Sequence, residues 1–190
     1  MTRDAWEAQR RKDIRIEGLE PCLDMFGLPQ AVAGADACRG GWCVVTLPVD
    51  GDAPVEVVDR LAKVATRQAR GQVGAVGVDI PIGLPDKSTR QADVLARRAL
   101  PGRASSVFTT LTRGAYLADD RAAADAVNRG LSGQGVGAQA FALRAKILEV
   151  DAWLRTRPTV EVVEVHPEVS FATMAGAVLP GKRTDDGQRA

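Results

Sequence analysis

Five short β-prone runs, the last two of which follow helical sequence, constrain the fold of this chain more than any other feature. The dipeptide Asp50-Gly51 separates the second run from the third, and Asp-Gly between β-prone runs is a strong signal for a tight hairpin. We therefore expect the first three strands to pair in sequence as an antiparallel meander. The expected strands lie at about 31–37, 42–48, 54–58, 73–80 and 159–166.

Helical periodicity fills the sequence between the later strands. Helices are expected at 59–70, at 89–100 before Pro101-Gly102, at 117–129 before Gly130, along 141–154, and from a turn that begins at Glu168. A strand that is reached through a helical crossover runs parallel to its neighbour in the sheet. The sequence therefore predicts an α/β fold, with a mixed five-stranded sheet, helices on both faces, and the first, fourth and fifth strands side by side.

Composition limits the organisation and the class of the protein. A chain of 190 residues with 45% hydrophobic content is long enough for one compact domain. We expect a domain over 31–190 that follows an N-terminal extension at 1–30. The formal charge of +1, from 25 basic and 24 acidic residues, excludes a whole-protein field that attracts polyanions.

Cysteine usage and the apolar pattern bear on location. Cys22, Cys38 and Cys43 are odd in number and lack paired CxxC spacing, which favours reduced thiols. No run approaches the roughly 20 apolar residues that span a bilayer, and no signal peptide is visible at the N-terminus. The expectation is a cytoplasmic protein without membrane contact.

Three carboxylates interrupt the apolar runs at corresponding strand ends. Asp36 ends the first strand, Asp79 ends the fourth, and Glu164 lies near the end of the fifth. Adjacent strands lie about 4.8 Å apart, so these acids can converge on a divalent cation. Hard oxygen ligands favour Mg²⁺ or Mn²⁺ over zinc. The alternative is that each acid only caps a strand end or the helix that follows it.

Basic and hydroxyl side chains follow the fourth strand. Between Lys87 and Arg103 the chain has five basic residues and one acid, and two serines come soon after; the candidates for binding substrate phosphate are Arg90, Arg97, Arg103, Ser105 and Ser106. A solvated helix face is the competing interpretation. His166, the only histidine, is a candidate to orient a water or a phosphate, although a structural role is the commoner one for a lone histidine.

Five sequence blocks resemble one family. The blocks GADACRGGW, VGVDIPIGLP, RQADVLARRALPGRASSVF, QAFALRAKILEVD and EVHPEVSFATMAG, in this order, resemble domain of unknown function family 429, which is regarded as a family of predicted nucleases with the RNase H fold. The resemblance implies strand order 3-2-1-4-5, which makes Asp36, Asp79 and Glu164 neighbours. The motif positions that it implies are Arg90, Asp93, Arg97, Ser105, Ser106, Gln139, Lys146, Glu149, Asp151, His166 and Glu168.

The family looks longer than this chain at the C-terminal end, so the expected domain lacks its final helix. That helix often supplies the last metal ligand in RNase H-like nucleases. Its absence would also expose apolar sheet surface and favour a homo-oligomer.

Three functions follow as hypotheses. The first is a magnesium- or manganese-dependent nuclease in which Asp36, Asp79 and Glu164 bind metal while Glu168 or His166 positions water. The second is a non-catalytic module on the same fold that binds nucleic acid or a protein. The third is a nucleotide-binding phosphotransferase, which the sequence disfavours because it has no glycine-rich phosphate loop in a strand–turn–helix context.

Overall fold

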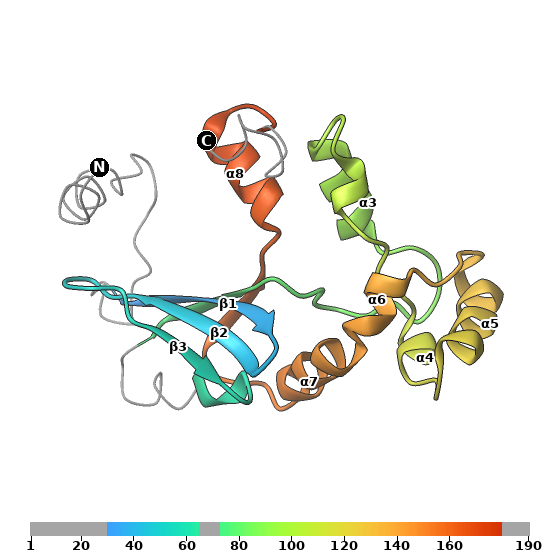
Figure 1. Ribbon diagram of the computed structural model, residues 1–190, viewed down its shortest axis with the longest axis horizontal. Helices are drawn as coiled ribbons and strands as arrows, with labels where there is room; N and C mark the ends of the chain where they lie inside the picture. Colours follow the sequence, from blue (N-terminus) through green and yellow to red (C-terminus); the bar gives the residue numbers. More distant parts are fainter. Residues whose placement is uncertain (1–29, 65–72, 180–190) are drawn as a thin grey trace.

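The protein is an α/β domain built on a mixed sheet. A computed structural model describes residues 30–64 and 73–179, and Figure 1 shows the arrangement of the elements. In this part of the chain five strands form one sheet in the order β3-β2-β1-β4-β5, as expected. The strands are β1 (Val32–Cys38), β2 (Gly41–Leu47), β3 (Val55–Val58), β4 (Ala75–Val78) and β5 (Glu161–Glu164).

The first three strands form the expected antiparallel meander. β1 pairs with β2 over their whole lengths, from Val32 opposite Leu47 to Cys38 opposite Gly41. β2 pairs with β3 across the turn that contains Gly51, whose φ of 94° lies in the region that favours glycine. Gly41 has a φ of 140°, and a Cβ there would lie 2.1 Å from the carbonyl oxygen of Val58. Glycine is therefore required where the chain enters β2.

The two crossover strands lie parallel to β1. β4 pairs with β1 so that Ala35 lies opposite Val78, and β5 pairs with β4 so that Val78 lies opposite Glu164. All three strands therefore end at the same edge of the sheet. This arrangement confirms the predicted adjacency of the first, fourth and fifth strands.

The helices lie where the periodicity indicated, with shifted boundaries. They are α3 (Gln91–Ala99), the 3₁₀ turn η1 (Ala104–Ser106), α4 (Arg113–Tyr116), α5 (Arg121–Ser132), α6 (Ala138–Ala142), α7 (Arg144–Arg155) and α8 (Pro167–Ala175). Of the helix expected at 59–70, residues 62–64 are helical, and 65–70 lie outside the described residues.

Two helix boundaries were predicted wrongly, for local reasons. The helix expected at 117–129 begins four residues later, at Arg121, because Asp120 is its N-cap and the Asp120 side chain accepts the Ala123 N–H at 2.8 Å. α5 also continues through Gly130 and ends at Gly133, whose φ of 73° permits the left-handed cap. The helix expected along 141–154 is divided between α6 and α7 at Leu143.

The main core lies on one face of the sheet. Trp42, Val44, Val76 and Val78 are almost completely buried there, and α7 packs against them through residues that include Ile147. On the opposite face the sheet is much more open. Val55 and Val57 of β3, for example, are 65% and 60% exposed.

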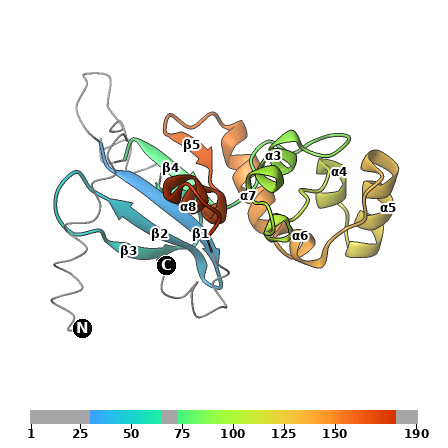
Figure 2. The ribbon, with the colours of Figure 1, turned by 90° about the horizontal axis from the view of Figure 1, so that it is seen from above.

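A second, smaller cluster joins α3, η1 and α8. Its buried members are Leu100, Val107 and Ala172, and it is separate from the main core. α8 rises on the side of the sheet opposite α7, and from above it lies over the middle of the sheet (Figures 1 and 2). No helix in 30–64 or 73–179 is both long and apolar enough to cross a membrane.

Candidate functional site

Asp36 and Asp79 occupy matching positions on adjacent parallel strands. The last paired residues of β1 and β4 are Ala35 and Val78, and the two aspartates follow them directly. The Asp79 N–H donates to the carbonyl oxygen of Ala35 at 3.0 Å, which holds the two strand ends together. Because successive side chains alternate between the faces of a sheet, both carboxylates belong to the open face.

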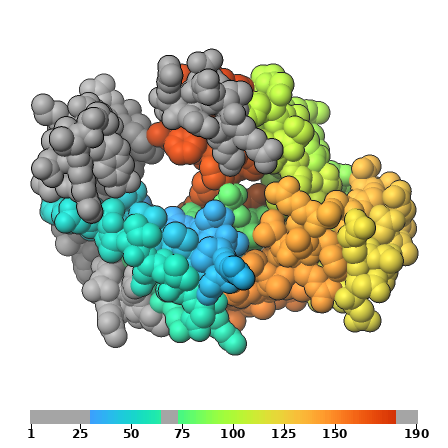
Figure 3. All heavy atoms as spheres, in the orientation of Figure 1, coloured from blue at the N-terminus to red at the C-terminus, as the bar shows by residue number. Residues whose placement is uncertain are grey.

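A cavity of about 290 Å³ lies beside this pair of acids on the open face. Figure 3 shows the molecule hollowed between the blue strands and the orange-red residues that lead into α8. Most of the cavity wall is apolar. Its lining residues are Gly34, Ala35, Asp36, Cys43, Val45, Gly77, Asp79, Val165 and Pro167.

Glu164 does not join the two aspartates, which differs from the expected three-carboxylate cluster. Glu164 lies in register with Val78, one residue before the position that matches Asp79, so its side chain leaves the sheet on the other face. Its carboxylate accepts two hydrogen bonds from Arg90, both at 2.5 Å. It also accepts the Ile82 N–H at 2.8 Å. The glutamate is therefore engaged within the protein.

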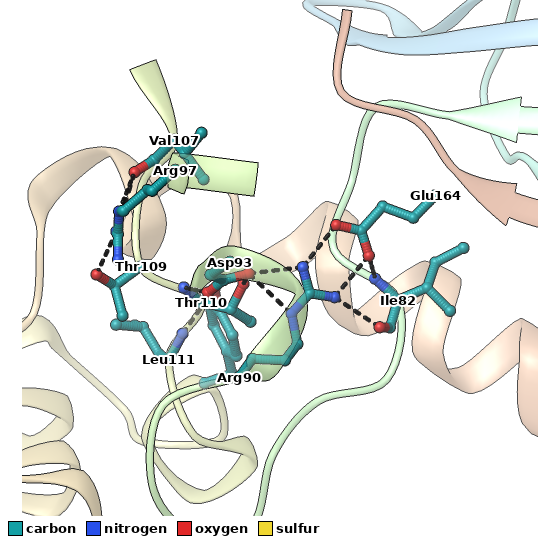
Figure 4. A network of polar contacts seen from close by, with 10 residues as sticks. Ile82, Arg90, Asp93, Arg97, Val107, Thr109, Thr110, Leu111 and Glu164 are labelled. Carbon is teal, nitrogen blue, oxygen red and sulfur yellow. Dashed lines mark hydrogen bonds and ion pairs between the residues drawn. The ribbon is translucent and has the colours of Figure 1, made fainter. Parts of the chain in front are cut away.

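Arg90 is the centre of a polar network that connects β5, α3 and the segment after Asp79 (Figure 4). Besides Glu164, its guanidinium donates to the carbonyl oxygen of Ile82 at 2.6 Å and to Asp93 at 2.7 and 2.9 Å. Asp93, only 2% exposed, also accepts the backbone N–H and the hydroxyl of Thr110. We call Arg90, Asp93, Glu164 and Ile82 the Arg90 clamp.

The clamp has a clear electrostatic balance. Burial, the largest single effect on Arg90, lowers its pKa, but hydrogen bonds and attraction from Glu164 and then Asp93 outweigh burial and raise the pKa overall. The guanidinium is only 10% exposed and stays charged. It therefore fixes Ile82, three residues beyond Asp79, and is not directed toward a ligand in solvent.

A second, much smaller cavity borders Asp79 on the side of the clamp. Its volume is about 30 Å³, and its lining includes Asp79, Arg90, Glu164 and His166. Nδ1 of His166 is buried without a hydrogen-bond partner and lies 3.5 Å from Oε2 of Glu168. A space of this size holds about one water molecule. Asp79 thus borders both cavities, whereas Asp36 borders only the larger one.

The remaining residues expected to bind phosphate do not reach either cavity. Arg97 donates to the carbonyl oxygen of Val107 and to the hydroxyl of Thr109, so it ties α3 to the segment after η1. Arg103 donates to the carbonyl oxygen of Leu179 at 3.2 Å. Ser105 is exposed, and the hydroxyl of Ser106 is buried without a hydrogen-bond partner. The structure does not bring these four side chains into one phosphate-binding surface.

Three of the motif positions implied by the resemblance have structural roles on α7. Oε1 of Glu149 accepts the indole N–H of Trp42 at 3.0 Å and the Leu61 N–H at 2.9 Å. Lys146 lies over the Trp42 ring, 4.8 Å from its centroid. Asp151 is paired with Arg113 of α4. Gln139 is exposed on α6.

Sequence reasoning missed the cavity wall itself. Gly34 and Cys43 lie on the same face as Asp36, because Gly34 is two residues before it and Cys43 is its cross-strand partner. Strand alternation and the hairpin register were sufficient to find both residues. Thr110, which fixes Asp93, had no signal in the sequence because it is 17 residues away, beyond the end of α3 and the turn η1.

The donor set decides which metal the site suits. Within the described ranges no group of three or more His, Cys, Asp or Glu side chains is placed to hold a metal ion. A closed zinc site, which needs four protein ligands, does not fit. Magnesium does fit, because it keeps several waters and is commonly held by one or two carboxylates together with substrate phosphate. Asp36 and Asp79 are the two carboxylates that qualify.

Comparison with known proteins identifies the family but no characterised relative. No curated protein and no solved structure matches the chain. The model of a family described as "Protein of unknown function (DUF429)" matches residues 34–190, which include the whole sheet except the first two residues of β1. The match therefore covers both aspartates, the cavity and the Arg90 clamp, and the chain belongs to the DUF429 family.

Proposed function

We propose that the protein is a metal-dependent nuclease with an RNase H-like site, which hydrolyses phosphodiester bonds at Asp36 and Asp79. One observation carries this proposal: two carboxylates directly follow the last paired residues of adjacent parallel strands and line the same cavity. Ligands of open α/β sheets bind outside the carboxyl ends of the strands, where these acids lie. The strand order 3-2-1-4-5 agrees with the RNase H-like fold that the family resemblance implies.

The two aspartates hold the cation in this proposal. A bound Mg²⁺ or Mn²⁺ supplies Lewis acidity, which stabilises the charge that develops on the phosphate. Asp36 is exposed, so it is accessible to a hydrated ion. Asp79 is half-buried, and the Arg90 clamp fixes the chain three residues beyond it. In this proposal the Asp36 carboxylate is therefore accessible to the cation, while the Asp79 carboxylate is held in position.

His166 is the candidate proton acceptor on the other side of Asp79. His166 lines the small cavity, which has room for about one water molecule, and its Nδ1 is buried without a hydrogen-bond partner. A neutral imidazole can accept a proton at such a nitrogen. Glu168, 3.5 Å away, would stabilise the imidazolium that results. Glu164 contributes through the clamp and not as a metal ligand.

Metal binding is tested by neutralising each aspartate. Without a cation the paired carboxylates repel each other, so Asp36→Asn and Asp79→Asn should be as stable as the unmodified protein, or more stable, in metal-free buffer. With Mn²⁺ the unmodified protein should gain about 2.7 kcal/mol at 100-fold saturation, and both variants should lose this gain. Thermal unfolding with and without Mn²⁺ measures the effect.

The matched control for this test is Asp119→Asn, an exposed acid between α4 and α5. It should keep the full Mn²⁺ response. If the unmodified protein shows no response to either metal, or if Asp36→Asn and Asp79→Asn respond like Asp119→Asn, the nuclease proposal fails. Mn²⁺ binding without metal-dependent cleavage of single-stranded, duplex or hybrid nucleic acid would instead support the non-catalytic binding module.

A further inference from the structure

The larger cavity lies where two adjacent strands have glycine at paired positions in the register. Gly34 of β1 and Gly77 of β4 are register partners on the open face, two residues before Asp36 and Asp79. A Cβ at Gly77 would lie 2.8 Å from Cγ2 of Val165, so that side chain already leans over β4. A Cβ at Gly34 would have no heavy atom within 4 Å. The open space therefore lies above β1, directly beside the Asp36 position.

The acids at one end of the cavity argue against a segment of protein as its natural occupant. An apolar helix or strand that covered the cavity would bury the exposed carboxylate of Asp36 in an apolar contact, which is costly. A ligand that arrives with a cation avoids this cost, because the cation neutralises the Asp36 carboxylate. The required ligand has an apolar part for the wall of Gly34, Val45 and Val165, and an anionic part that shares the cation with the acids.

We propose that this cavity binds a single nucleobase of a single-stranded substrate, with the adjoining phosphate at Asp36 and Asp79. The inference rests on the proposed function and adds the substrate class to it. A volume of about 290 Å³ is at the lower end for small-molecule sites, so one nucleotide unit fits better than a longer segment. Bases in a duplex stay stacked and paired, so only an unpaired or extruded base can enter.

The wall of the cavity also predicts weak discrimination among bases. Glycine, valine and proline offer no side-chain hydrogen bond to a base edge, and the thiol of Cys43 is only a weak donor. Contact with the flat face of a base is available to every base. We therefore expect binding that requires a base but depends little on which base it is.

Filling the space above Gly34 separates this inference from the metal site. Gly34→Val places a β-branched side chain in a strand, where it is favoured, and its Cβ meets nothing. Titration calorimetry with Mn²⁺ present should show that the unmodified protein binds adenosine monophosphate roughly tenfold or more tightly than inorganic phosphate. Gly34→Val should bind Mn²⁺ and phosphate normally but lose the extra affinity for the nucleotide.

Val57→Ile is the matched control, since it adds bulk to the same face of the sheet outside the cavity. It should retain the preference for the nucleotide. An unpaired deoxyoligonucleotide should compete with adenosine monophosphate, and the same strand in a duplex should not.

The outcomes distinguish the two proposals. Absence of Mn²⁺ binding by the unmodified protein would overturn the metal site and this inference together. Normal Mn²⁺ binding with equal affinities for nucleotide and phosphate, or an unchanged nucleotide preference in Gly34→Val, would overturn the base cavity alone.

Discussion

An ion pair between Asp151 and Arg113 joins α7 to α4. Asp151 of α7 accepts hydrogen bonds from the guanidinium of Arg113 on α4, and both side chains are largely buried, with 16% and 24% exposed. The hydrogen bond from Arg113 is the main cause that lowers the pKa of Asp151 below its ordinary value of 3.8, against the opposing effect of burial. This carboxylate is therefore stabilised in its charged form by the fold.

The shift predicts a pH-dependent contribution to stability. A group with a lowered pKa in the folded state contributes stability above its unfolded pKa and loses it as pH falls through the folded pKa. Asp151→Asn should therefore reduce the free energy of unfolding by about 1 kcal/mol at neutral pH. The difference should shrink as the pH falls below about 3.8. Denaturant unfolding at several pH values measures it, and a difference that stays constant from pH 7 to pH 2 would contradict this account.

At the scale of elements, the Arg90 clamp fastens α3 to the sheet. The first turn of α3 carries Asp93, and Arg90, at the N-cap position, donates to Asp93 and reaches across to Glu164 of β5. The three charged side chains of the clamp, Arg90, Asp93 and Glu164, differ in how far they are buried. Asp93 is 2% exposed, whereas Glu164 is 30% exposed.

The difference in burial predicts unequal costs of breaking the clamp. Arg90→Leu leaves the carboxylate of Asp93 buried without its cation and should cost about 3–5 kcal/mol of unfolding free energy. Glu164→Gln keeps an acceptor at the solvent edge and should cost about 1 kcal/mol. Arg98→Leu, at an exposed position on the same helix, should change stability by less than about 0.5 kcal/mol. Urea unfolding of the three variants decides, and equal costs for Arg90 and Glu164 would refute the assigned burial.

At the scale of the whole molecule, the two separate apolar clusters predict uneven local stability. The main core contains most of the buried side chains, while the second cluster has three buried residues between α3, η1 and α8. Elements with few buried contacts open at a lower free energy than the global transition. Backbone amides of α8 should therefore exchange with deuterium faster than those of β4. Native-state exchange followed by mass spectrometry measures this, and equal protection would show that the clusters unfold as one unit.

The sheet was predictable from the sequence because its signals are local. Asp50-Gly51 fixed the hairpin, and helical sequence before the fourth and fifth strands fixed their parallel direction. The helix boundaries near Asp120 and Gly130 were less predictable, since apolar periodicity does not show that Asp120 caps the start of α5 or that Gly133, and not Gly130, takes the left-handed conformation at its end. The expected association through exposed sheet surface stays a prediction.

The site was only partly predictable from the sequence. A shift of one residue in the register between two strands moves a side chain to the other face of the sheet, and the sequence does not show the register that closely. Asp36 and Asp79 matched in the sequence and match in the sheet. Glu164 looked equivalent, but it pairs with Val78 and so falls on the other face. The role of Arg90 was also hidden, because its partners Glu164 and Ile82 meet only after the sheet has formed. From its charge, Arg90 was expected to bind a substrate phosphate, but in the fold it pairs with Glu164 and Asp93 inside the protein.

The Arg90 clamp has a consequence for how the chain reaches this structure. Its hydrogen bonds join residues 74 and 82 positions apart, from Arg90 to Glu164 and from Ile82 to Glu164. Such distant pairings close long loops and form late, after local helices and the first hairpins. During synthesis, β1 and β4 leave the ribosome well before β5. The segment that follows Asp79 therefore acquires its final position only when the last strand has been made, so the candidate site matures at the end of folding.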